Sequence, residues 1–236
     1  MRNEIVFKVY GPYALFSDPI NRVGGEKFSY QIPTGQALIG VCESIYWKPT
    51  FRWIIDEVRI LKIIRTQRQG IRPISYIATY SDKGNTLSYY TYLMDVAYEV
   101  KAHFEWNLQR PDLEADRNEH KHHNIARRML EKGGRRDIFL GTRECQGYAE
   151  PVVFGEAPGA YDEYSSIYFD NMFYRYDYPG NTGGNELIAL FWRPVMKNGI
   201  IRFNEAEAQC TSKIIKVMAA KKPATNGLDE FEGEAI

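Results

Sequence analysis

The chain lacks any apolar run of the about 18 residues that a helix needs to span a bilayer. Its few cysteines, Cys42, Cys145 and Cys210, are widely spaced and form no CxxC pair. That pattern is typical of reduced thiols rather than of a disulfide framework or a zinc site. Met1-Arg2-Asn3-Glu4 leads directly into a predicted strand, without the apolar stretch of a signal peptide. We therefore expect a soluble, cytoplasmic protein.

The chain also lacks net charge, because 30 basic side chains balance 30 acidic ones among 236 residues. The balance hides an asymmetry. Residues 1–148 hold 22 lysines and arginines against 17 aspartates and glutamates, whereas residues 149–236 hold 8 against 13. A basic N-terminal part fits a polyanionic partner, and the acidic remainder argues against a protein that coats nucleic acid over its whole surface.

The predicted elements follow the order β-α-β-β-α-β, the ferredoxin-like pattern shared by many RNA-binding domains. Alternating apolar residues predict strands at 5–9, 54–64, 97–106 and either 136–141 or 145–153. The first helix begins at Thr34 and ends at Tyr46, because Pro49 follows closely. Along the third strand, the polar face from Glu99 to Glu105 is expected to be solvated.

These elements predict an α+β protein built around a ferredoxin-like domain over residues 1–150. An inserted hairpin at 65–96 separates the middle strands. Residues 151–220 predict a small antiparallel β-rich domain that ends in a short amphipathic helix near 205–220. The acidic tail, 221–236, is expected to be disordered.

Three of the four histidines fall in one predicted helical turn, Glu119-His120-Lys121-His122-His123. Asp116 and Glu119 resemble a capping box, and apolar positions at helical spacing continue until Gly133-Gly134. At about 100° per residue, His122 lies at the centre of that apolar stripe. Cations in a first helical turn oppose the helix dipole, which favours a nearby anion such as phosphate.

The ferredoxin-like order brings two distant segments together. It predicts that the end of the first helix, at Tyr46, lies beside the start of the second, at Lys121 and His122. A phenol, an ammonium and an imidazole supply the base, charge stabilisation and acid that attack by a ribose 2′-hydroxyl on its own phosphate needs. DNA lacks that hydroxyl, so such a site cleaves only RNA. Tyr46, Lys121 and His122 are therefore candidate catalytic residues.

Each candidate also has a plainer interpretation. His122 fits a hydrogen-bonded histidine at the edge of the core, and Tyr46 fits a packing aromatic at a helix end. His120 and His123, with Glu119, have the spacing of metal ligands, but the sequence offers no further ligand set. We expect no metal and no cofactor.

The predicted insertion interleaves arginines with tyrosines, which provide phosphate contacts and stacking platforms for unpaired bases. A tyrosine-rich hairpin that merely covers the sheet is the alternative. The candidate RNA-binding residues of the whole chain are Lys27, Arg65, Arg68, Arg72, Tyr76, His123, Arg127, Arg128, Arg135 and Arg136. Solvated surface charge explains the arginine pairs at 127–128 and 135–136 equally well.

Several short motifs point to one family when they are taken together. They are Gly24-Gly25-Glu26-Lys27, Glu43-Ser44-Ile45-Tyr46-Trp47-Lys48-Pro49, Val100-Lys101-Ala102-His103-Phe104-Glu105, Arg110-Pro111-Asp112, and Gly133-Gly134-Arg135-Arg136-Asp137-Ile138-Phe139-Leu140-Gly141 through Glu144-Cys145-Gln146-Gly147-Tyr148. In combination they resemble the CRISPR-associated Cas-five family, subtype I-C. The resemblance is strong over residues 1–150 and looser beyond.

The resemblance implies a repeat-associated mysterious protein (RAMP) that cleaves CRISPR precursor RNA without metal, at the base of the repeat's stem-loop. Such a protein then stays with the guide RNA as a subunit of the type I-C surveillance complex. The family's catalytic tyrosine falls on Tyr46 and its Lys-His pair on Lys121 and His122, although His120 and His123 flank that pair here.

The implied partners are the repeat RNA and the other subunits of that complex. Non-specific contact with duplex DNA is also expected, and contact with membranes is not. A non-catalytic RNA-binding subunit is the main alternative, since other subtypes of the family leave the cutting to a different protein. An unrelated metal-dependent phosphodiesterase is a third hypothesis.

Overall fold

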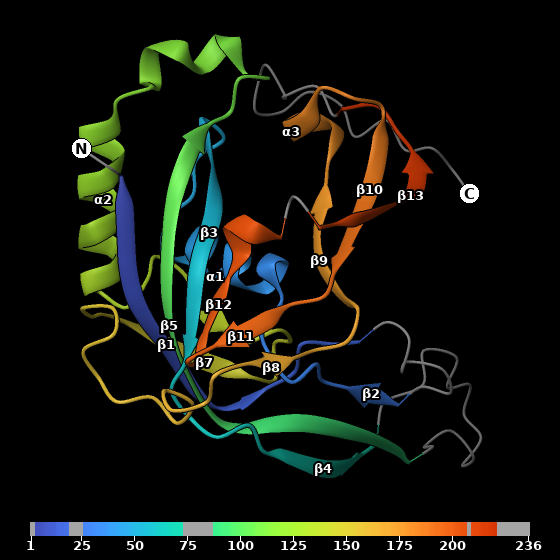
Figure 1. Ribbon diagram of the computed structural model, residues 1–236. Coiled ribbons are helices and arrows are strands. Elements are labelled where there is room, and N and C mark those ends of the chain that lie inside the picture. Colours follow the sequence, from blue (N-terminus) through green and yellow to red (C-terminus); the bar gives the residue numbers. More distant parts are fainter. Residues whose placement is uncertain (1–2, 19–25, 73–86, 207–208, 221–236) are drawn as a thin grey trace, which may run out of the picture.

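The structure is a computed structural model that describes residues 3–18, 26–72, 87–206 and 209–220 of the chain (Figure 1). Its centre consists of strands β1 (Glu4–Ala14), β3 (Phe51–Ile60), β5 (Ser88–Trp106) and β7 (Gln146–Pro151) and of helices α1 (Gly35–Ile45) and α2 (Glu119–Glu131). The strands lie side by side in the order β7-β1-β5-β3, and every neighbouring pair is antiparallel. This arrangement confirms the predicted ferredoxin-like core.

The two helices pack on the central strands, α1 against β3 and α2 against β1 and β7. Helix α1 begins where it was predicted, because the Thr34 hydroxyl accepts a hydrogen bond from the backbone N–H of Ala37 at 3.1 Å. Helix α2 begins one residue after Asn118, whose side chain accepts from the backbone N–H of Lys121. The predicted cap at Asp116 was therefore wrong, because the Asp116 carboxylate binds other groups.

Strand β3 differs from the predicted strand at 54–64. It occupies residues 51–60, and its register against β5 shifts between Ile55 and Glu57. Ile55 and Val58 are both buried, although they are three residues apart. A bulge of this kind reverses which residues face the core, and simple alternation in the sequence cannot reveal it.

The described residues of the predicted inserted hairpin, 65–72 and 87–96, are continuous with the core. Strand β4 (Thr66–Ile71) pairs with the first half of β5, and β5 then runs without a break into the central sheet. The short β2 (Lys27–Phe28) also pairs with this extension. Tyr76, one of the candidate RNA-binding residues, lies outside the described residues.

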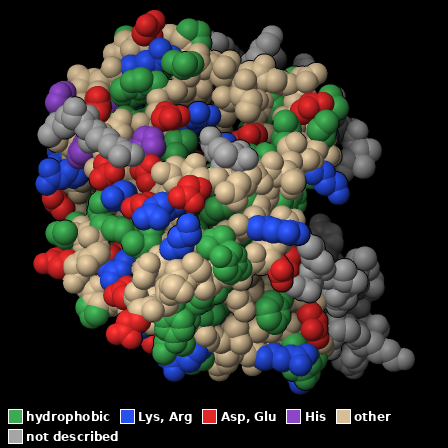
Figure 2. Space-filling view, viewed as in Figure 1, with side chains coloured by type: hydrophobic (Ala, Val, Ile, Leu, Met, Phe, Trp, Pro, Cys, Tyr) green, Lys and Arg blue, Asp and Glu red, His purple; other side chains and the backbone are tan. Residues whose placement is uncertain are grey.

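The polar face of β5 is only partly solvated. Glu99 is 1% exposed and accepts from the Arg59 guanidinium at 3.2 Å and from the backbone N–H of Gly155 at 2.8 Å. Arg59 also binds Asp162, and this ion pair holds the loop between β7 and β8 against the sheet. The expectation of a solvated face was therefore wrong at Glu99. Elsewhere this face carries intermixed basic and acidic side chains rather than one basic field (Figure 2).

Strands after residue 150 divide between two sheets. Strands β12 (Ile200–Arg202), β11 (Val195–Lys197) and β8 (Ile167–Tyr168) extend the main sheet beyond β3, and β6 (Ile138–Phe139) extends its other edge beyond β7. Of the two alternatives for the fourth strand, the later one, β7, pairs with β1.

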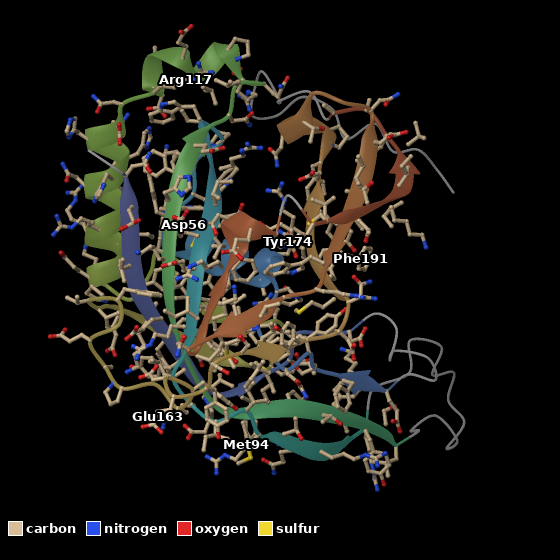
Figure 3. All side chains as sticks on the ribbon, in the orientation of Figure 1. Asp56, Met94, Arg117, Glu163, Tyr174 and Phe191 are labelled. Carbon is tan, nitrogen blue, oxygen red and sulfur yellow. The ribbon has the colours of Figure 1, made fainter. Side chains whose placement is uncertain are left out.

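The predicted small antiparallel sheet is present. It consists of β13 (Thr211–Val217), β10 (Glu186–Trp192) and β9 (Met172–Asp177), and the short α3 (Pro179–Thr182) follows β9. The helix predicted near 205–220 was wrong. A single 3₁₀ turn, η3 (Phe203–Glu205), precedes β13, whose β-branched residues favour a strand that pairs with β10. Tyr174 of β9 faces the main sheet and stacks on Phe203 at 5.8 Å (Figure 3).

Candidate active site

Tyr46 and His122 meet in the interior, although 76 positions separate them in the sequence. The Tyr46 hydroxyl lies 2.8 Å from Nδ1 of His122. Tyr46 ends α1 with an extended backbone, and its carbonyl accepts a hydrogen bond from the Trp53 indole at 2.7 Å. Tyr46 is 2% exposed and His122 is fully buried. The predicted proximity of the two helix ends is thus present in the fold.

An aromatic cluster surrounds the His122 ring. The ring centroids of Phe51, Trp106 and Phe104 lie 5.3, 5.9 and 6.3 Å away in edge-on orientations, and Tyr46 stacks on the imidazole at 5.9 Å. The cluster follows from the position of His122 on the apolar stripe of α2. His122 is therefore a hydrogen-bonded core histidine, as its plainer interpretation predicted, and it also contacts a hydroxyl.

Asp116 is the residue of this site that the sequence did not reveal as a site residue. It ends a 3₁₀ helix, η2 (Pro111–Asp116), and its carboxylate accepts from the Lys121 ammonium at 2.5 Å and from the Thr50 hydroxyl at 2.7 Å. Its backbone carbonyl lies 2.8 Å from Nε2 of His122. The hydrogen bonds from Lys121 and Thr50 lower the pKa of the Asp116 carboxyl to about 2. An aspartate directly before the helix, interpreted as a cap, was the available signal.

The electrostatics keep the Tyr46 phenol protonated at neutral pH. Burial raises its pKa, and the negative charge of Asp116 raises it further, against an opposing effect of the Arg135 guanidinium. The pKa of His123 is lowered, first by burial and then by the positive charge of Arg127. His123 is half-buried and His120 is exposed, so neither takes the place that His122 holds beside Tyr46.

The other basic candidates near this site lie at the surface. Arg127 and Arg128 are exposed on α2, and Arg135 and Arg136 are exposed just after it. Arg135 lies near the site, because its backbone N–H donates to the carbonyls of Ser44 and Ile45, directly before Tyr46.

A second basic group lies on the hairpin at the far end of β5. The Arg68 guanidinium lies over the Tyr89 ring at 4.2 Å, and the Lys27 ammonium lies over Tyr90 at 4.7 Å. Arg65 lies 3.6 Å from the Asp95 carboxylate, and Arg72 is exposed.

The fold does not bring these two basic groups together. In the hairpin, β4 pairs with the first residues of β5. Trp106, the last residue of β5, instead contacts His122. The strand rises about 3.3 Å per residue, so its 19 residues span roughly 60 Å along their path. The hairpin and the start of α2 accordingly lie at opposite ends of the main sheet (Figure 1).

Two further observations concern metals and membranes. Within the described ranges, no three His, Cys, Asp or Glu side chains are arranged to hold a metal ion. The helices of those same ranges include none that is long and apolar enough to cross a membrane.

The sequence matches a family model. The model, Cas_Cas5d, is described as CRISPR-associated protein (Cas_Cas5), and it matches residues 4–204. The chain belongs to the Cas5d family. The match confirms the family that the sequence motifs indicated, and it continues past residue 150, where the resemblance of those motifs became looser.

Individual Cas5d relatives agree with this assignment. The chain is 27% identical over 228 residues to "CRISPR pre-crRNA endoribonuclease Cas5d" of Mannheimia succiniciproducens, covering 85% of this chain and 95% of that protein. It is 34% identical over 161 residues to the protein of the same name from Thermus thermophilus, covering 64% and 65%. A solved structure titled "Crystal Structure of CRISPR-associated Protein" is 36% identical with a TM-score of 0.74, over 89% of this chain and 96% of that one.

Proposed function

We propose that the chain is a metal-independent endoribonuclease that cuts CRISPR precursor RNA within the repeat. The observation that carries the proposal is the 2.8 Å contact between the Tyr46 hydroxyl and His122, with the Lys121 ammonium one residue away on the same helix turn. The substrate class is supported by the printed names of the two relatives, which are pre-crRNA endoribonucleases.

The proposed reaction divides three tasks among three side chains. Tyr46 receives the proton of the attacking 2′-hydroxyl and passes its own proton to Nδ1 of His122. The 2′-oxygen then bonds to phosphorus as the bond from phosphorus to the 5′-oxygen breaks. Lys121 supplies the positive charge that stabilises the phosphorane. Its side chain is half exposed, so a phosphate at the surface can reach it.

Burial sets one requirement for this reaction. Tyr46 is 2% exposed, so bound RNA has to displace the surface side chains above it before the 2′-hydroxyl reaches the phenol. Lys121 is already accessible and offers the first contact for the phosphate. Catalytic hydrogen bonds commonly tighten only in the substrate complex, so the buried pair is compatible with catalysis.

RNA contacts are proposed at both basic groups. Around the catalytic pair they involve Arg127, Arg128, Arg135, Arg136 and the half-buried His123. At the far end of β5 they involve Arg65, Arg68 and Arg72 at β4 and Lys27 on the neighbouring β2. Tyr76, outside the described residues, stays a candidate from the sequence. The two groups lie at opposite ends of the main sheet, so a repeat stem-loop at Tyr46 and its single-stranded flank at the hairpin fit this arrangement. We further propose that the chain remains bound to the processed RNA with other subunits of a type I-C surveillance complex.

The test is cleavage of the cognate repeat RNA in excess chelator, with analysis of the product ends. We expect unchanged cleavage, a 2′,3′-cyclic phosphate on the upstream product and a 5′-hydroxyl on the downstream product. A deoxy substitution at the nucleotide before the cut should block cleavage and leave binding nearly unchanged. Products with a 5′-phosphate and a 3′-hydroxyl would indicate attack by water and reject this mechanism.

A second function is favoured by the burial of Tyr46 and His122. If RNA never displaces the residues above them, the pair is structural and the chain is a non-catalytic subunit that binds the guide-RNA handle. Purified protein that binds repeat RNA but leaves it intact under all conditions would support this alternative.

A further inference from the structure

Asp116 occupies a position that links the two buried partners to the surface. It is 30% exposed, and three separate elements hold it: Thr50 before β3, Lys121 on α2 and its own 3₁₀ helix. The segment is itself fixed, because the Arg117 guanidinium donates to the backbone carbonyls of Asn107 and Arg110, each at 3.2 Å. The Asp116 carboxylate and carbonyl are therefore held rigidly in front of the His122 ring.

The contacts of His122 determine its tautomer. A backbone carbonyl can only accept, so Nε2 of His122 must carry the proton that it donates to the Asp116 carbonyl at 2.8 Å. In the neutral ring, Nδ1 is then an acceptor, and the Tyr46 hydroxyl donates to it at 2.8 Å. The ring is therefore prepared to take a proton from Tyr46.

We propose that Asp116 is a positioning residue that completes a Tyr46–His122–Asp116 proton relay. The proposal deepens the function proposed above and rests on it. When His122 accepts the phenolic proton it becomes an imidazolium, and Oδ2 of Asp116 lies 3.3 Å from its Nε2. A carboxylate at that distance stabilises the cation, as the aspartate does in a hydroxyl–imidazole–carboxylate triad.

The surroundings of His122 leave this role to Asp116. The described charged or titratable groups that face the ring are Tyr46 from α1, Asp116 from η2 and Lys121 from α2, and the remaining neighbours are the aromatic rings of β3 and β5. Lys121 binds the same carboxylate, so Asp116 is the group among these that carries a negative charge.

The protons balance along this path. The 2′-hydroxyl proton moves to the Tyr46 oxygen, and the phenolic proton moves to Nδ1 of His122, while the bond from the 2′-oxygen to phosphorus forms and the bond to the 5′-oxygen breaks. The departing 5′-oxygen takes a proton from water. The hydroxide that remains is neutralised by the proton that His122 returns through Tyr46, which restores the starting state.

The decisive variant is Asp116→Asn, because it retains the size of the side chain and the backbone carbonyl but removes the negative charge. We expect single-turnover cleavage to slow about 10- to 100-fold, with RNA affinity within a few-fold of wild type. A neutral amide stabilises the imidazolium less than a carboxylate does, so the acidic limb of the rate profile should move to lower pH. Asp112→Asn is the matched control, since Asp112 lies in the same 3₁₀ helix but pairs with Arg110.

Two further measurements separate the relay from a purely structural role. Thr50→Val removes the hydroxyl that holds the carboxylate and should shift the profile in the same direction by less, and Thr50→Ser should restore it. Long-range ¹H–¹⁵N NMR of the RNA-free protein should show the proton of the neutral His122 ring on Nε2, where it is donated to the Asp116 carbonyl.

The outcomes are distinguishable. If wild-type protein cuts no repeat RNA, the proposed function fails, and the NMR measurement still tests the His122 tautomer on which the relay depends. An unchanged rate and an unchanged rate profile in Asp116→Asn would overturn the relay. Faster cleavage with tighter RNA binding would overturn it as well, because the carboxylate would then be competing with the RNA phosphate for Lys121.

Discussion

The backbone N–H of Arg135 donates a hydrogen bond to the carbonyl of Ser44 at 3.1 Å. Ser44 lies in the last turn of α1, whose carbonyls lack partners within the helix, and Arg135 follows the glycine turn that ends α2. The contact requires Gly134 to take a positive φ of 116°, which glycine adopts without a steric penalty. The end of α1 is thus joined through the main chain to the segment that follows α2, directly before Tyr46 in the sequence.

Tyr46→Phe is expected to reduce single-turnover cleavage by two orders of magnitude or more. The substitution keeps the ring and its packing against Phe51 but removes the hydroxyl that contacts His122. The free energy of unfolding should fall by about 1–3 kcal/mol, because Nδ1 of the buried His122 loses its donor, and RNA affinity should stay within a few-fold. Tyr164→Phe, at an exposed tyrosine, is the control and should retain full activity. Unchanged cleavage by Tyr46→Phe would return Tyr46 to a packing role.

His122→Ala is expected to nearly abolish cleavage, by about 10²–10⁴-fold, while repeat-RNA affinity stays within a few-fold. His122 is fully buried, so the variant is also expected to be less stable. Rates are therefore compared at a temperature where circular dichroism shows the variant to be folded. At saturating protein, where any loss of RNA affinity is masked, His120→Ala and His123→Ala should cleave at close to the wild-type rate. If His122→Ala retained activity and His120→Ala or His123→Ala lost it, the catalytic role would belong to that neighbouring histidine.

Arg68→Glu on the hairpin is expected to weaken repeat-RNA binding and to reduce its dependence on salt. The Arg68 guanidinium and the Tyr89 ring are positioned to contact a phosphate and a base together. Cleavage at saturating protein should change little, since the hairpin is far from Tyr46. Lys213→Glu, at an exposed position of β13, is the charge-matched control. Equal losses of affinity in both variants would indicate a non-specific effect of charge.

Asp116 also predicts a specific response of stability to acid. Its folded-state pKa of about 2 is below the ordinary value of 3.8, so its ion pair stabilises the folded state above pH 4. Wild type should exceed Asp116→Asn in unfolding free energy at pH 7 by at most about 1 kcal/mol, because the pair is partly exposed. Urea denaturation at several pH values should show this difference shrinking between pH 4 and 2. A difference that grows in that range would contradict the assignment.

Arg59→Ala is expected to lower the free energy of unfolding by about 3–5 kcal/mol, because it leaves Glu99 buried without its cation. Arg52→Ala removes an arginine of the same strand from the exposed Glu105 and should cost less than about 1 kcal/mol. Urea denaturation of both variants gives the comparison. Similar losses would mean that the Arg59 pair is not desolvated as the fold indicates.

The sequence by itself determined most of the local elements and the proximity of the candidate residues Tyr46 and His122. Thr34 begins α1 and Gly133-Gly134 ends α2, because caps and glycine turns act within a few residues. The alternation of apolar and polar residues predicted β1, and helical spacing predicted that His122 lies on the buried side of α2. These signals depend on neighbours in the chain, so they survive without knowledge of the fold.

Only the tertiary structure decided the features that depend on contacts between distant segments. The bulge at Asp56 changed which residues of β3 face the core. Pairing with β10 made 211–217 a strand. A loop from beyond residue 150 covered Glu99. Asp116 resembled a helix cap because its neighbours fit one, whereas Thr50 and Lys121 bind it in the folded chain. A carboxylate bonds with whichever donors the fold brings within reach, and the order of residues does not specify which these are.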